Sequence, residues 1–298
     1  MTKRPLPLKL RKPHTMLPVL WLLPMCLFLL LFVFLPLLVT IWDSLFAVSL
    51  LDTSTREFVG LGNYQAVLSD ADVQRSLGNT LFYLIVALVS ETILGMALAL
   101  AFRQKFRGRG ILIGILMIPW ALPPIVNGIL WRFIFDPANG LWNSILWNIG
   151  IIESFRVWMN DPAFSKWCVI VVHIWKMLPL ITVLFMARLQ TLSEDILEAA
   201  ELDGAGFWQK FKTIIFPHLR PILFITLAQG AIGAFHLFDE AYAMTGTALD
   251  TRSLLIQDYL IAFREYNLGT GMALALIISI LILACMFLFA KLSRRQDL

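Results

Sequence analysis

Ionisable and amide side chains interrupt several long apolar stretches of this 298-residue sequence. Glu91 lies inside "VALVSETILGM", and Lys176 follows His173 by about one helical turn inside "VVHIWKMLPL". A charged side chain at the centre of a membrane costs roughly 2.5–3.5 kcal/mol on insertion scales, so each is a functional candidate. Such side chains could bind a hydroxyl-rich solute near the membrane midplane. The candidates for this pathway are Glu91, Trp120, Asn127, Lys176, Gln229, His236 and Asp239.

Some of these candidates have structural alternatives. Glu91 could instead pair with Lys176 or His173 as a bridge inside the protein, because a buried charge needs a partner. Asp239 could face the water outside the membrane. Trp120 could offer an aromatic face to a sugar ring.

No arrangement typical of catalysis or metal binding accompanies these residues. The four histidines are dispersed, and there is neither an H-E-x-x-H nor a G-x-S-x-G motif. The sequence also lacks the G-x-x-x-x-G-K-[ST] loop that cradles ATP phosphates, so the chain cannot bind ATP in that way. The three cysteines have no paired spacing, which predicts neither a disulfide nor a metal site.

The composition predicts an all-α integral membrane protein. Hydrophobic residues make up 59% of the chain and charged residues 15%, whereas soluble domains are roughly a quarter charged. A span needs about 20 mostly apolar residues, and its backbone must be hydrogen-bonded internally, which predicts helices. The basic segment 1–15 precedes an apolar stretch too long for a cleaved signal peptide. The transmembrane domain, 16–298, has predicted spans at about 16–42, 79–102, 111–135, 167–189, 221–243 and 272–290.

The distribution of Lys and Arg predicts the orientation of these spans. Of the 24 cationic residues, 16 lie in or beside the N-terminal segment, the two even-numbered connections and the C-terminus. Positive charge marks the cytoplasmic side of a membrane protein. Both termini and the segment 190–217 are therefore predicted to be cytoplasmic, and the net charge of +4 reflects topology rather than nucleic-acid binding.

Three long connections, 43–78, 136–166 and 244–271, are predicted on the outer side. They are rich in aromatic and turn residues, so we expect a folded cap or docking surface rather than disorder. For "LWNSILWNIGIIESF" the alternative is an amphipathic segment resting at the headgroups with its tryptophans as anchors.

The segment 190–217 is predicted to form two short helices joined at Gly204. Either Thr191 or Ser193 can cap the first helix, and Asp-Gly at its end is a stop signal. The second helix is predicted to end at Pro217. Small alanines beside an acidic rim favour a docking element over a solvated connector.

Within this segment, "EAAELDGAGFWQKFKTIIFP" resembles the EAA signature of permease subunits of binding-protein-dependent ABC importers. The stretches "FVGLGNYQAVL", "PWALPPIVNGILWRFIFDPANGLWN" and "FDEAYAMTGTALDTRSLLIQDYLIAF" resemble the carbohydrate-uptake subfamily, MalF-like or UgpA-like. The resemblance covers about residues 20 to 290. It departs at Phe216, where the family often has leucine, and at "MTGTALDT", where a Gly-Gly-Pro turn is common.

The resemblance implies the six-helix fold of a type I importer permease, with a coupling helix that enters a cleft of a separate ATPase subunit. It also implies that the part of span five with Gln229 and His236 lines the sugar site. It assigns the coupling role to Glu198, Ala199, Ala200, Asp203, Gly204 and Ala205.

The implied function is import of a carbohydrate or related polyol into the cytoplasm by alternating access. The implied partners are a second permease in a heterodimer, a dimer of ATP-binding subunits that hold ATP and Mg, and an extracytoplasmic solute-binding protein. The implied location is a bacterial-type cell membrane, and this chain is not itself an enzyme. The alternative is a stand-alone secondary transporter or channel for a small polar solute, which would need an internal repeat.

Overall fold

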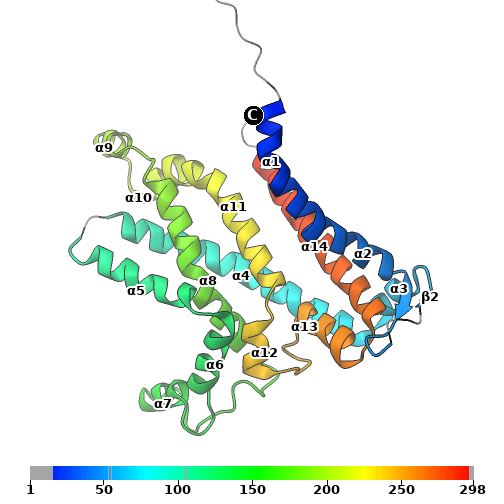
Figure 1. The fold of residues 1–298 in the computed structure, drawn as a ribbon. Coiled ribbons are helices and arrows are strands. Elements are labelled where there is room, and N and C mark those ends of the chain that lie inside the picture. The colour runs from blue at the N-terminus through cyan, green and yellow to red at the C-terminus, as the bar shows by residue number, and fades with distance from the viewer. Residues whose placement is uncertain (1–15, 53, 55, 105, 295–298) are drawn as a thin grey trace, which may run out of the picture.

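The computed structural model describes residues 16–52, 54, 56–104 and 106–294, and it is a bundle of long helices with short elements at its ends (Figure 1). Among these residues five helices are long and apolar enough to cross a membrane, or six if one bent pair counts as a span. The sheet found there is a single antiparallel hairpin, β1 (Phe46–Val48) with β2 (Arg56–Phe58). The prediction of an all-α membrane protein is confirmed.

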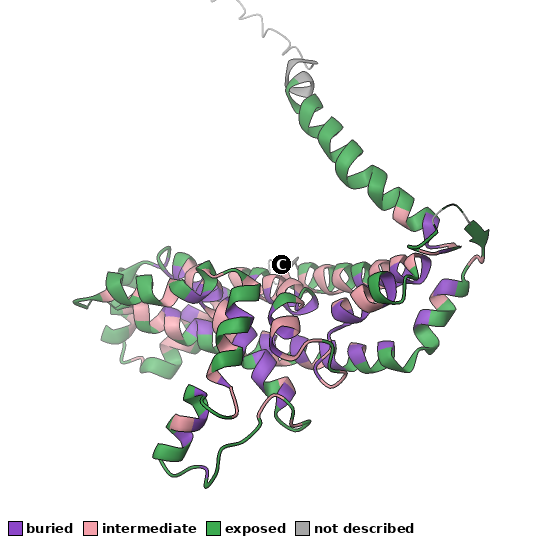
Figure 2. Cartoon of the chain, turned by 60° about the horizontal axis from the view of Figure 1, so that its bottom comes forward, coloured by how far each residue is buried: buried purple, intermediate pink, exposed green. Residues whose placement is uncertain are grey.

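The first helix is almost entirely exposed from Trp21 to Trp42. It runs through α1 (Met16–Leu29), the π-turn η1 (Leu30–Phe34) and α2 (Leu35–Asp43). Figure 2 shows it extending from the body of the chain with an exposed surface. Its candidate span, Trp21–Asp43, has a mean hydropathy of 2.9 and buries none of its most apolar window within this chain. That surface therefore faces lipid or another subunit.

The centre of the fold is the packing of α4 (Ala71–Arg103) against α8 (Ser165–Leu189), with α11 (Phe216–Phe235) alongside. A Cβ atom placed on Gly95 of α4 would lie 2.7 Å from Cγ2 of Ile181 on α8. The two backbones approach this closely because Gly95 has no side chain. Leu219 of α11 and Phe185 of α8 are fully buried in the same cluster.

Two prolines bend the predicted third span sharply. The helices α5 (Arg109–Ala121) and α6 (Pro124–Ile134) meet at 100°, because Pro123 and Pro124 cannot continue the hydrogen-bond ladder of α5. Arg109 shares a pocket with Leu189 at the end of α8, whereas Phe135 shares one with Trp167 near its start. The bent pair thus covers the length of α8, so we count it as the sixth span.

The three predicted outer connections contain folded elements. The first holds the hairpin and α3 (Gly62–Ser69), the second holds α7 (Leu141–Asn148), and the third holds α13 (Leu254–Tyr259) and the π-turn η3 (Leu260–Arg264). Asn143 of α7 is fully buried, and its Oδ1 accepts hydrogen bonds from Trp158 Nε1 at 2.7 Å and from Arg156 N at 3.2 Å. This amide holds α7 to the chain that follows it.

The fifth helix differs from the predicted span 221–243. A continuous helix runs through α10 (Phe207–Lys210), the π-turn η2 (Phe211–Ile215) and α11, and it ends at Phe235. A break at residues 236–238 separates it from α12 (Asp239–Thr245). The last helix, α14 (Leu268–Arg294), extends beyond the predicted 272–290 at both ends.

The prediction that Pro217 ends a helix is wrong. Pro217 follows the π-turn η2, in which Phe216 N–H bonds to Phe211 O, five residues back. A π-turn widens the helix and removes the i→i−4 bond that a proline would break. Pro36 has the same position after η1, so the chain uses this arrangement twice to carry a proline through a long helix.

The contact at Gly95 can be tested against another glycine of α4. We expect Gly95→Ala to cost about 1–3 kcal/mol, because its methyl group overlaps Ile181. Gly78→Ala adds the same atom where no neighbour lies within 4 Å, so it should be neutral or stabilising by up to about 1 kcal/mol. The apparent Tm of the purified chain in detergent measures both. Equal Tm values for the two variants would contradict the packing described.

Candidate functional site

The segment after α8 begins with the helix α9 (Glu194–Leu202). Its cap is Ser193, whose Oγ accepts a hydrogen bond from Asp195 N at 3.2 Å. Thr191, the other predicted cap, instead donates to Arg188 O at 2.8 Å and bonds His218 Nε2 at 3.0 Å. Thr191 therefore ties the end of α8 to the helix that follows the segment.

Gly204 ends α9 in the left-handed conformation, with φ +81°. Ala205 N donates to Ala200 O at 2.9 Å, and Gly204 N donates to Glu201 O at 3.0 Å. These two bonds form a Schellman motif, which commonly requires glycine at this position. No atom lies within 4 Å of a Cβ built on Gly204, so backbone conformation rather than space demands the glycine.

The six predicted coupling residues lie together on α9 and the turn after it. Glu198, Ala199, Asp203 and Gly204 are exposed, and Ala200 and Ala205 are partly buried. Large apolar side chains next to them are also exposed, with Leu202 at 90%, Trp208 at 76% and Phe207 at 60%. An exposed apolar patch of this kind, rimmed by acidic residues, is typical of a protein–protein interface.

Inside the bundle, Glu91 pairs with His173. Glu91 Oε1 lies 3.7 Å from His173 Nε2, and the two side chains are 2% and 4% exposed. Two glycines of α11 make room for them: a Cβ on Gly230 would lie 2.8 Å from Glu91 Oε2, and one on Gly233 would lie 3.3 Å from His173 Nε2. Of the two partners predicted for Glu91, His173 is therefore the one beside it, but neither side chain has a hydrogen-bond partner among the described residues.

Lys176 pairs with a residue that the sequence analysis did not single out. Its Nζ lies 3.7 Å from Glu240 Oε1 on α12, with side chains 14% and 6% exposed. The sequence could have indicated Glu240 as a candidate, because it lies within the predicted span 221–243 and a carboxylate there has the same insertion cost as that of Asp239. Asn127 of α6 is fully buried, next to Gly128, where the backbone of α12 approaches closely.

The remaining pathway candidates are more accessible. His236 lies exposed in the break after α11, and its Nδ1 bonds to Ile232 O at 2.9 Å. Asp239 is exposed at the start of α12, Gln229 is partly buried, and Trp120 is 45% exposed on α5. These four candidates are therefore at least partly accessible to solvent, whereas Glu91 and Asn127 are buried.

The described part of the chain offers no group of three His, Cys, Asp or Glu side chains that could hold a metal ion. Cys26, Cys168 and Cys285 are all free thiols there. An all-helical chain with five or six candidate spans and an exposed apolar segment at one end is a multi-pass membrane protein with a surface for another subunit.

Comparison with known proteins identifies the class more narrowly. Residues 91–297 match the family described as binding-protein-dependent transport system inner membrane component. The chain is 34% identical over 293 residues to the trehalose/maltose transport system permease protein MalF of Thermococcus litoralis, covering 97% of this chain and 98% of that one. It is 30% identical over 252 residues to the trehalose transport system permease protein SugA of Mycobacterium tuberculosis, covering 85% and 80% of the two chains.

The fold also matches a solved structure. A bacterial ABC transporter involved in the import of the acidic polysaccharide alginate superposes with a TM-score of 0.80 at 19% identity, covering 94% of this chain and 96% of that one. The chain therefore belongs to the family of binding-protein-dependent transport system inner membrane components. It is a multi-pass inner-membrane permease subunit of an ABC transporter, and a partner subunit binds and hydrolyses ATP.

The conformation of Gly204 gives a test of the coupling role. We expect Gly204→Val to insert and assemble but to lower the ratio of solute transported to ATP hydrolysed several-fold, because a β-branched residue costs about 1–2 kcal/mol or more in this conformation. Gly204→Asn is the matched control, since asparagine tolerates the left-handed region. The ratio is measured in proteoliposomes. A Gly204→Val complex that transports normally would remove the coupling role from this turn.

Proposed function

We propose that this chain is one of two different transmembrane subunits of a carbohydrate importer, and that it works by alternating access. The curated relatives described above are named for trehalose and maltose transport, and one of them aligns over 97% of this chain. The observation that carries the proposal is the exposed patch around α9, where Leu202 and Trp208 would otherwise remain in water. A stand-alone transporter or channel would have no use for this patch.

The proposed complex contains a second permease, a dimer of ATP-binding subunits and an extracytoplasmic solute-binding protein. The ATP-binding subunit receives α9, with Glu198, Ala199 and Ala200 on the surface that enters its cleft. The family description supports the binding protein. The apolar surface of Trp21–Asp43, which this chain does not bury, is available to lipid or to the second permease.

Helix α8 provides the mechanical link in this proposal. It carries Lys176 in its middle and ends at Leu189, immediately before the coupling segment. Leu189 lies 13 positions after Lys176, a rise of roughly 20 Å along a helix. A displacement of α9 by the ATPase is therefore passed, through one continuous helix, to the Lys176–Glu240 pair and to α12.

The proposed solute pathway follows the accessible polar residues near the break between α11 and α12. His236 and Asp239 are exposed there and can bond to sugar hydroxyl groups, and Gln229 lies further along α11. Trp120 offers an exposed ring. Lys176 contributes by holding α12 in place, and Asn127 and Glu91 stabilise the helices behind the pathway.

Alanine variants of two pathway residues test the site. We expect His236→Ala and Gln229→Ala to raise the solute concentration needed for half-maximal stimulation of ATP hydrolysis about three- to tenfold, because each removes a hydrogen bond worth about 0.5–1.5 kcal/mol. Complex assembly should be unchanged. Asn148→Ala, at the exposed end of α7, is the control. An unchanged response in both variants would show that these residues only pack.

A further inference from the structure

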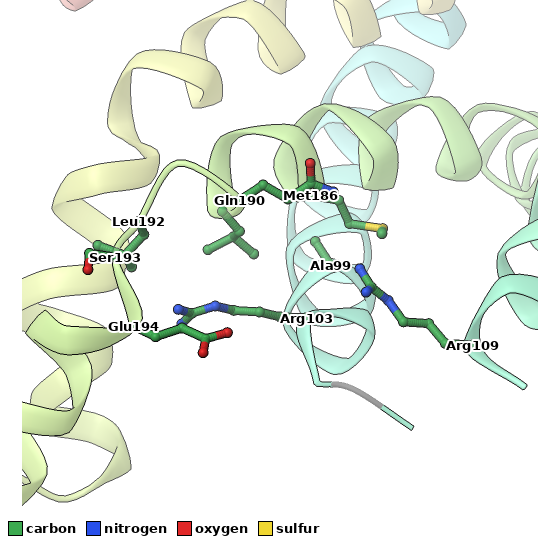
Figure 3. Close-up of a pocket in the computed structure, with 9 residues that line it drawn as sticks. Ala99, Arg103, Arg109, Met186, Gln190, Leu192, Ser193 and Glu194 are labelled. Atoms are coloured by element: carbon green, nitrogen blue, oxygen red, sulfur yellow. The ribbon is translucent and has the colours of Figure 1, made fainter. Parts of the chain in front are cut away.

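A pocket of about 380 Å³ lies where the ends of α4 and α8 meet the starts of α5 and α9. Figure 3 shows that it is framed by Arg103 of α4, Arg109 of α5, and the chain from Gln190 to Glu194. The segment predicted to be cytoplasmic supplies one wall, and three membrane-spanning segments supply the rest. The pocket therefore lies at the cytoplasmic boundary of the membrane.

The lining of this pocket is amphipathic. Ala99, Leu189 and Leu192 are at most 7% exposed and form an apolar wall together with Met186. The polar part consists of the two arginines with Gln190, Ser193 and Glu194. A ligand that fits both parts carries an apolar portion next to a polar head.

The arginines decide the charge of that head. Both arginines line the pocket, and Figure 3 shows Arg103 directed toward Glu194 and Arg109 directed toward Ala99 and Met186. Nε of Arg109 is buried and has no hydrogen-bond partner among the described residues. Two guanidinium groups outweigh the single carboxylate of Glu194, and a guanidinium binds phosphate through two parallel hydrogen bonds.

We propose that this pocket binds the phosphate headgroup of an anionic phospholipid from the cytoplasmic leaflet. Arg109, whose Nε has no partner among the described residues, holds the phosphate, and Arg103 adds a second positive charge to the same lining. The apolar wall formed by Ala99, Met186 and Leu189 contacts the first part of the acyl chains. A soluble phosphate compound would use only the arginines and would leave this wall unused. Each cytoplasmic Lys or Arg near the membrane surface adds to the attraction for anionic lipids.

A bound lipid would contact the start of α9, because Ser193, which caps α9, lines the pocket together with Leu192 and Glu194. A filled pocket fixes the start of α9 relative to α4 and α8. This consequence rests on the proposed coupling role of α9, whereas lipid binding itself does not.

The test is native mass spectrometry of the purified full-length chain with added phosphatidylglycerol or phosphatidylcholine. We expect the chain to retain phosphatidylglycerol preferentially, and the double variant R103Q/R109Q to weaken that binding about tenfold or more. The matched control is R107Q/R220Q, which removes the same charge from two exposed arginines outside the pocket. R103K/R109K keeps the charge and should retain much of the preference, which separates charge loss from misfolding.

Three results would overturn the proposal. An equal loss in R107Q/R220Q would mean that general surface charge attracts the lipid. Equal retention of phosphatidylcholine would mean that the headgroup is not recognised. Displacement of the lipid by millimolar glycerol phosphate, with no dependence on acyl chains, would assign the pocket to a soluble phosphate compound instead. Loss of sugar-stimulated ATP hydrolysis without loss of lipid binding would count against the proposed function and leave the lipid site standing.

Discussion

The close packing of α4 against α8 is the interaction on which the other features of this permease depend. Gly95 allows the two backbones to meet at Ile181, and this contact holds α8, one helix from Ser165 to Leu189, against α4. Helix α8 then presents His173 and Lys176 to its neighbours at one level and positions α9 at its end. If α4 and α8 separated, Glu91 and His173 would lose their contact, and the pocket lined by Arg103 and Ser193 would lose one wall.

The two buried pairs show how a chain in an apolar environment accommodates charged side chains. Glu91 and His173 fit because Gly230 and Gly233 have no side chains. Lys176 reaches Glu240 across the boundary between α8 and α12. The buried Lys176–Glu240 ion pair is costly to break from one side, because the remaining charge has no partner. This pair holds α12 beside α8, whereas His236 and Asp239 near the break before α12 are exposed.

The sequence predicts the parts of this structure that follow from local patterns. The apolar stretches locate the spans, and the consecutive prolines after Leu122 locate the sharp bend in the third. The Asp-Gly stop at Gly204 predicts the end of α9, because only a local backbone conformation is involved. The EAA segment also predicts the family, binding-protein-dependent permeases, to which residues 91–297 match.

Other features depend on long-range contacts or on uncommon helix geometry. Pro217 predicts the end of a helix, yet the helix continues because a π-turn precedes the proline. The residues of that turn, "FKTII", have no composition that would predict it. The choice of His173 rather than Lys176 as the partner of Glu91 is set by the rotation of α8 relative to α4, which spacing alone does not determine. Likewise, Arg103 and Arg109 appear in sequence as ordinary positive charges at a cytoplasmic boundary. Only the fold brings them to one pocket.

The central claim is that α9 is the surface through which this permease contacts its ATPase. Site-specific photo-crosslinking from Leu202, which is 90% exposed, in cells that contain the whole transporter tests this claim most directly. Leu51, 76% exposed beside the hairpin that follows the first span, is the control on the opposite side of the membrane. The account predicts a covalent adduct between Leu202 and the ATP-hydrolysing subunit, with none from Leu51. If Leu202 gives no such adduct while the ATPase still co-purifies with the permease, the claim is contradicted.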